Sequence, residues 1–466
     1  MHKLSNLMNP KRTFTFRMQE MVRVGDGLRV SIVVLCACLS TPVASRNAFC
    51  QTAQEAQAVL ERKDYKTAEE SYRKLLIGQP NSPELWTNLG IALQAEGKST
   101  PAIQAFQHAL RLRYLPNAYA LLAEEKCKVR DLNGARPMLS RILREQKVNG
   151  RLIAVVAPCY LELDEPLESI EVYQQLMDQP FFPDDLARIQ LIRSYLKAAQ
   201  HFMRELEASP EGVEYIRAIQ IARDSGSTDA RSAYSLAERS SPYFKADLNF
   251  PRALKVWQGH PKDPALLYQM SVLSGEEILK QVNFCENRYQ SSPYFEQFRA
   301  DAIANQHHLD EASAMYQLLI ERYPQLPELR YSLGMLYIEQ EQWSKALAVF
   351  REQLSDHPND ERTANRVSQC LINLQQYQEL RSFLHPWVER ENSPLWAHLD
   401  LATVFERAGL PSDEIKELMA AEKESPDDRS IHFRLLTLDR RAGDQVGTAY
   451  EANELKRLQA QGAHSQ

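Results

Sequence analysis

The sequence lacks the short motifs that mark common enzymes and cysteine-based metal sites. No His-Glu-x-x-His, Gly-x-Ser-x-Gly or Gly-x-Gly-x-x-Gly occurs in its 466 residues, and these motifs are typical of zinc proteases, serine hydrolases and dinucleotide-binding domains. The chain has seven cysteines and no Cys-x-x-Cys pair, which excludes the usual zinc and haem attachment patterns. We therefore expect a protein that is not an enzyme, with no catalytic residue, no cofactor and no metal.

Two partial motifs do not change this expectation. Gly97-Lys98-Ser99 resembles the end of a phosphate-binding loop, but Ala92 occupies the place of the first glycine. His307 and His308 lie beside acidic residues, yet no third ligand with zinc-like spacing is near, which favours a solvated turn.

The chain also lacks a basic surface pattern. Residues 1–50 carry seven basic and two acidic side chains, and subtracting them from totals of 55 and 61 leaves a net charge of −11 on residues 51–466. Binding to phosphate backbones needs clustered lysine and arginine. We expect no nucleic-acid partner.

No apolar run reaches the roughly 20 residues that a membrane-spanning helix needs. The run Val30–Leu39 has ten residues, follows Arg23 and Arg29, and precedes small residues. This layout predicts a signal peptide over residues 1–50, cut after Ser45 or after Cys50. A start at Met18 or Met21 would shorten its long basic lead.

The leader has a second interpretation. Leu35-Cys36-Ala37-Cys38 resembles a bacterial lipoprotein box, which would attach a lipid at Cys38. Either interpretation predicts export, to the periplasm or the medium, or to a membrane surface as a lipoprotein. Beyond the leader the chain has four cysteines, Cys127, Cys159, Cys285 and Cys370. We expect them to be buried thiols, and the alternative is a disulfide between Cys127 and Cys159.

A motif with a 34-residue period dominates the remaining sequence. One copy consists of Trp86, Leu89, Gly90, Ala102, Phe106 and Ala109, and another of Leu333, Gly334, Tyr337, Ala346, Phe350 and Pro358. The spacing predicts pairs of helices, in which small residues allow close approach and the aromatic residue fills the remaining gap. A fixed period of this size indicates stacked, identical units.

This pattern resembles the tetratricopeptide-repeat family, in an exported bacterial form. The resemblance implies an all-α, right-handed superhelical solenoid of helix pairs, here called helix A and helix B. We divide the chain into a leader (1–50), an N-terminal array of about four repeats (51–180), an irregular helical middle (181–291), a C-terminal array of about five repeats (292–460) and a tail (461–466).

The middle contains a second internal similarity. Ser240-Ser241-Pro242-Tyr243-Phe244 recurs 51 residues later as Ser291–Phe295. This offset is one repeat plus 17 residues, so we interpret residues 247–263, which contain Trp257, as an inserted loop. Loops that project from a scaffold often carry function.

The resemblance implies a binding surface on helix A of successive repeats, which faces the concave groove in this family. We expect a non-catalytic scaffold or adaptor in the bacterial cell envelope that holds a protein or peptide segment there. The alternative is an envelope polymer or small-ligand binding protein that uses the middle segment and Trp257. The candidate partner-binding residues are Tyr331, Met335, Ile338, Arg362, Asn365, Arg366, Gln369 and Trp257.

Overall fold

The computed structural model describes residues 53–144, 150–224, 237–238, 240–324, 326, 328–390 and 393–463. Within these ranges every secondary-structure element is a helix, as the repeat pattern predicts. The expected leader, with Cys38 and both cut positions, lies outside the described residues. The expectation of an all-α repeat solenoid is confirmed.

The chain divides into two compact units, residues up to Glu328 and residues from Leu329. The first unit has a helix over residues 53–61, then α2 (Tyr65–Gly78), α3 (Pro83–Ala95), α4 (Ser99–Leu112), α5 (Pro116–Lys128), α6 (Leu132–Arg144), α7 (Gly150–Glu162), α8 (Pro166–Met177), α9 (Asp184–Glu207), α10 (Pro210–Asp224), α12 (Phe250–Gly259), α13 (Pro264–Arg288), α14 (Pro293–Asn305) and α15 (Leu309–Arg322). The second has α16 (Leu329–Glu339), α17 (Trp343–Asp356), α18 (Glu361–Asn373), α19 (Tyr377–Val388), α20 (Leu395–Ala408), α21 (Pro411–Glu424), α22 (Arg429–Ala442) and α23 (Gln445–Ala463).

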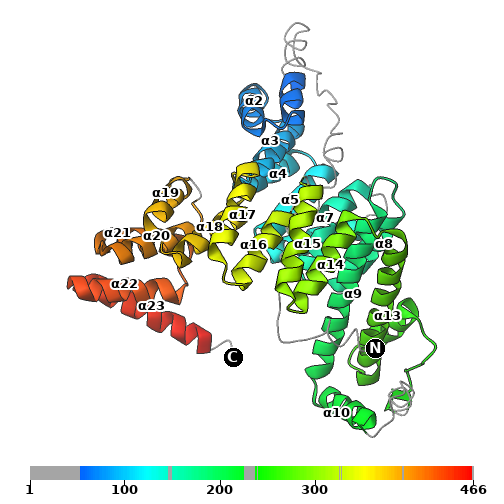
Figure 1. Ribbon diagram of the computed structural model, residues 1–466. Coiled ribbons are helices and arrows are strands. Elements are labelled where there is room, and N and C mark those ends of the chain that lie inside the picture. Colours follow the sequence, from blue (N-terminus) through cyan, green and yellow to red (C-terminus); the bar gives the residue numbers. More distant parts are fainter. Residues whose placement is uncertain are drawn as a thin grey trace. The chain divides into compact units, whose positions relative to one another are not determined.

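Within each unit most helices pack against the next helix in the sequence (Figure 1). Helix A of one repeat also contacts helix A of the next, as α3 and α5 do in the first unit and α18 and α20 in the second. Local signals in the sequence set the helix ends. Ser82 caps α3 by accepting a hydrogen bond from the Leu85 amide, and Pro83 begins the helix. Gly97, with a φ of 78°, makes the turn into α4.

Inside a repeat, a glycine on one helix lies close against an aromatic ring on the other. A Cβ atom on Gly90 would lie 2.5 Å from Cε1 of Phe106, and a Cβ on Gly334 would lie 2.5 Å from Cε1 of Phe350. Both rings are fully buried. The same contact in both units explains why the 34-residue period fixes a glycine on helix A and an aromatic residue on helix B.

The middle segment is built around one elongated helix pair. Helices α9 and α13 have 24 and 25 residues, whereas α3 to α8 have 12 to 14. The start of α9 lies beside the end of α13, where Asp184 accepts a hydrogen bond from the hydroxyl of Tyr289 at 2.6 Å. The two helices therefore pack antiparallel. The next repeat continues the stack, since α14 contacts α9.

Residues 247–263, which the sequence analysis interprets as an inserted loop, include helix α12. Asn249 caps this helix by accepting a hydrogen bond from the Arg252 amide, and Pro251 lies in its first turn. The two Ser-Ser-Pro-Tyr-Phe copies also differ, since Ser292 caps α14 whereas Pro242 and Tyr243 lie in a turn. Helices α10 and α12 therefore lie between α9 and α13 in the sequence. The spacing of the repeat motif alone does not reveal this arrangement.

Two further expectations concern the described helices. The thiols of Cys127, Cys159, Cys285 and Cys370 are free and buried, so the alternative of a Cys127–Cys159 disulfide is not observed. The last helix continues to Ala463, beyond the predicted end of the array at residue 460. Among the described residues no helix is both long enough and apolar enough to cross a membrane.

Candidate partner-binding surface

The second unit brings four of the predicted residues together on two neighbouring A helices. Tyr331 projects from α16, and Arg362, Arg366 and Gln369 project from α18; we call these four residues the arginine–tyrosine cluster. The Arg362 guanidinium carbon lies 3.8 Å from the centre of the Tyr331 ring. Nε of Arg366 donates to the Tyr331 hydroxyl at 3.3 Å, and another guanidinium nitrogen donates to Oε1 of Gln369 at 2.8 Å.

The cluster holds two positive charges one helical turn apart. Tyr331 stacks on one guanidinium and accepts a hydrogen bond from the other, and these contacts orient both arginine side chains. Gln369, the second partner of Arg366, is also neutral. Because all four side chains are half-buried, the cluster is partly ordered before any ligand arrives. Preorganised guanidinium groups are suited to binding a carboxylate.

Arg330, which lies on α16 with Tyr331, has a different role. Arg330 lies 3.5 Å from Oε2 of Glu352 and 3.3 Å from Oδ2 of Asp356, both on α17. These ion pairs join helix A to helix B within one repeat. Arg330 therefore has a structural role. Arg366 differs, because it donates hydrogen bonds to the neutral side chains of Tyr331 and Gln369.

The other predicted residues are distributed differently. Met335 and Ile338 lie on α16 and Asn365 lies on α18, all three half-buried. Trp257 lies in the first unit, on α12. Its ring packs edge-on against Phe202 at 5.2 Å and its Nε1 donates to the Pro261 carbonyl at 3.2 Å. These contacts give Trp257 a packing role in the first unit.

A buried carboxylate links α18 to the next A helix, α20. Asp400 accepts a hydrogen bond from the Ser368 hydroxyl at 2.6 Å. Burial raises the pKa of Asp400 to about 6, although the hydrogen bond from Ser368 opposes the rise. The carboxylate is therefore ionised in neutral solution and holds the two A helices in register.

Two histidine–glutamate pairs in the last two described repeats were not predicted from the sequence. His398 contacts Glu417 at 2.7 Å, and His432 contacts Glu451 at 2.6 Å. Both histidines and both glutamates are 34 residues apart, so the repeat period was the signal that could have found them. By contrast, His307 and His308 lie in the turn before α15, where His308 is exposed and lies 3.6 Å from Glu311.

The helix pairs and the A-helix surface define the class of an all-α repeat solenoid. A family model described as "Tetratricopeptide repeat" matches residues 54–118 and 299–361. Both segments are therefore tetratricopeptide repeats. Such repeats are protein–protein interaction scaffolds and are generally non-catalytic.

The chain is also similar to several solved structures, each at low sequence identity. A double mutant of MamA RS-1 has 17% identity and a TM-score of 0.34, over 37% of this chain and 97% of that one. The APC/C hetero-tetramer Cut9–Hcn1 has 13% identity and a TM-score of 0.30, over 88% and 94% of the two chains. Naa15/Naa10 bound to HypK-THB has 12% identity and a TM-score of 0.27, over 88% and 63%. No curated protein matches the chain.

Proposed function

We propose that this protein is a non-catalytic adaptor that binds a segment of a partner protein through the arginine–tyrosine cluster. The observation that carries the proposal is the joint contact of Arg362 and Arg366 with Tyr331. A repeat scaffold repeats its A-helix surface along the stack, which suits it to an extended segment. In the alternative, a polymer or small-ligand binder in the middle segment, the aromatic contact would come from Trp257, which is half-buried and packs edge-on against Phe202.

The chemistry of the cluster favours a partner segment that carries a carboxylate. Two guanidinium groups supply several N–H donors in fixed planes, which match an acidic side chain or a chain terminus. The amide of Asn365 on the same helix is suited to hydrogen bonds with a peptide backbone. The net charge of −11 on residues 51–466 would disfavour acidic partners elsewhere on the surface, so the cluster would also determine where such a segment binds.

We expect the double substitution Arg362→Glu and Arg366→Glu to reduce partner binding at least about tenfold, because two charge-assisted contacts become repulsive. The measurement is quantitative crosslinking and mass spectrometry of a tagged chain starting at Gln51, incubated with native envelope extract.

The matched control is Lys416→Glu with Lys423→Glu, which reverses two exposed charges on α21 in the same unit. This control should retain the partner. Equal retention by both double variants would contradict the proposed site, and equal loss would indicate a general charge effect in its place.

The basic lead, the ten-residue apolar run and the small residues after it support export of this adaptor to the cell envelope. We expect the intact mass of the protein purified from its native host to correspond to a chain that begins at Arg46 or Gln51. A lipid-modified chain beginning at Cys38 would select the lipoprotein form of the same proposal. A mass that retains residues 1–50 would contradict export.

A further inference from the structure

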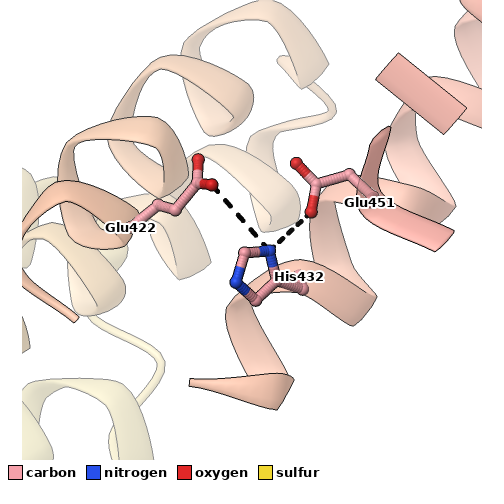
Figure 2. A group of neighbouring side chains, drawn as sticks. All are labelled: Glu422, His432 and Glu451. Carbon is pink, nitrogen blue, oxygen red and sulfur yellow. Dashed lines mark hydrogen bonds and ion pairs between the residues drawn. The ribbon is translucent and has the colours of Figure 1, made fainter. Parts of the chain in front are cut away.

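Three helices at the C-terminal end of the second unit direct acidic and imidazole side chains at one point. Glu422 lies on α21, His432 on α22 and Glu451 on α23 (Figure 2). Nδ1 of His432 is 2.6 Å from Oε2 of Glu451 and 3.9 Å from Oε1 of Glu422. One ligand atom from each residue lies within 4.8 Å of the others. His432 and Glu451 are 1% and 4% exposed, so this cluster is buried.

The hydrogen bonds of His432 determine what the cluster requires. The other ring nitrogen, Nε2, lies 2.8 Å from the Pro426 carbonyl oxygen. A carbonyl oxygen only accepts, so Nε2 carries a proton and donates it. In the neutral ring Nδ1 then presents a lone pair toward two carboxylates (Figure 2). Three acceptor atoms around one point repel each other unless a cation, either a proton or a metal ion, lies between them.

The histidine one repeat earlier, His398, has part of the same surroundings as His432. Nδ1 of His398 contacts Glu417 at 2.7 Å, and its Nε2 contacts the Ser393 hydroxyl at 2.7 Å. The position equivalent to Glu422, 34 residues earlier, is Val388. The histidine–glutamate pair is therefore common to both repeats, whereas a second carboxylate lies near His432 and has no counterpart at the position of Val388. A pair needs one shared proton, but the cluster of three has an additional negative charge to compensate.

We propose that Glu422, His432 and Glu451 bind a divalent transition cation of the zinc type. One imidazole nitrogen and two carboxylate oxygens are suitable ligands for Zn²⁺, which leaves a fourth position for water. Ligand atoms placed about 2.0–2.2 Å from the ion are roughly 3–3.5 Å apart in tetrahedral geometry. The present separations of 2.6 and 3.9 Å to Nδ1 lie on either side of this value, so small side-chain rotations would form the site.

Surrounding groups support the same arrangement. A ligating histidine characteristically donates its second N–H to a backbone carbonyl, as His432 does to Pro426. The hydroxyl of Tyr450 donates to Oε1 of Glu422 at 3.2 Å and orients that carboxylate. The carboxylates of Glu422 and Glu451 both lie near Nδ1, and this negative surrounding favours a cation there.

The ligands come from two successive repeats. Glu422 belongs to the pair α20–α21, whereas His432 and Glu451 belong to the final pair α22–α23. A bound cation would therefore fasten the terminal repeat to the preceding one. Adjacent repeats in such a stack are stabilised by the interface between them, so a cation at this interface would add to the stability of both repeats.

The test uses the full chain, freed of metal and titrated with Zn²⁺, with Co²⁺ as the spectroscopic probe. We expect one Zn²⁺ per chain and a visible Co²⁺ absorption band. Glu422→Gln should weaken binding at least about tenfold. Glu422 is the outermost ligand and the farthest from Nδ1, so the metal-free variant should unfold at the same temperature as the parent chain.

Glu417→Gln is the matched control, because it makes the same change in the sister pair. It should leave Zn²⁺ affinity within about twofold of the parent value, and Zn²⁺ should raise the unfolding temperature of the parent and of this control but not that of Glu422→Gln. Equal affinity in both variants would overturn the proposal, since the metal would then bind elsewhere. No saturable binding would also overturn it and leave a proton as the compensating cation.

Discussion

Replacement of Gly90 by valine is expected to destabilise the N-terminal unit by about 3 kcal/mol. The new Cβ would lie 2.5 Å from Cε1 of Phe106, well inside contact distance, and that ring is fully buried. Separation of α3 from α4 would relieve the overlap but open the core of that repeat. Urea unfolding followed by circular dichroism measures the loss.

Gly78→Val is the matched control, because Gly78 also lies in a helix of the first unit but has no atom within 4 Å of the added Cβ. This control should change the free energy of unfolding by less than about 1 kcal/mol. In a Phe106→Ala background, Gly90→Val should cost much less than in the parent, because the side chain that it meets has been removed. An equal cost in both backgrounds would show that the contact with Phe106 is not the cause.

The parts of the fold that follow from local spacing could be predicted from the sequence. Gly90 and Phe106 are 16 residues apart, the same separation as Gly334 and Phe350, because each pair closes one helical hairpin. The sequence therefore predicts both hairpins and the helices that carry them. The elongated pair α9–α13 could not be predicted in this way, since α10 and α12 separate its two helices in the chain.

The candidate sites show the same limit. The positions of Tyr331 and Arg362 on A helices follow from the repeat, and the resemblance to the family places both on one surface. Their stacking does not follow, because it depends on side-chain conformations in two successive repeats. Glu422 and Glu451 are ordinary acidic residues in the sequence. They become a possible metal site when α21 and α23 approach His432 from opposite sides (Figure 2).

Loss of Arg193 is expected to destabilise the first unit by about 3 kcal/mol near pH 8. Arg193 on α9 donates to Oδ2 of Asp301 on α14 at 2.9 Å, and the Tyr316 hydroxyl on α15 donates to the other carboxylate oxygen. These bonds connect the middle segment to the C-terminal repeat series. Arg193→Met would leave a mostly buried carboxylate with one neutral donor. Urea unfolding at several pH values measures the effect.

The pH dependence identifies the stranded carboxylate as the cause. Burial raises the pKa of Asp301 above its ordinary value, while the charge of Arg193 opposes that rise. Without Arg193 the folded state would bind the proton still more tightly than the unfolded chain does. Stability of Arg193→Met should therefore increase as the pH falls toward 5, and the loss relative to the parent should shrink.

Two further variants separate this charge effect from a loss of packing. Arg193→Met with Asp301→Asn should recover most of the loss, because no unpaired charge remains buried. Arg204 lies on α9, as Arg193 does, and forms an exposed ion pair with Asp164. Arg204→Met should lower the free energy of unfolding by less than about 1 kcal/mol. If Arg193→Met costs no more than Arg204→Met, then α9 does not hold α14 through this ion pair. The elongated pair would then join the repeat stack through its other contacts, which include the hydrogen bond from the Ser292 hydroxyl to Asp185 at 2.6 Å.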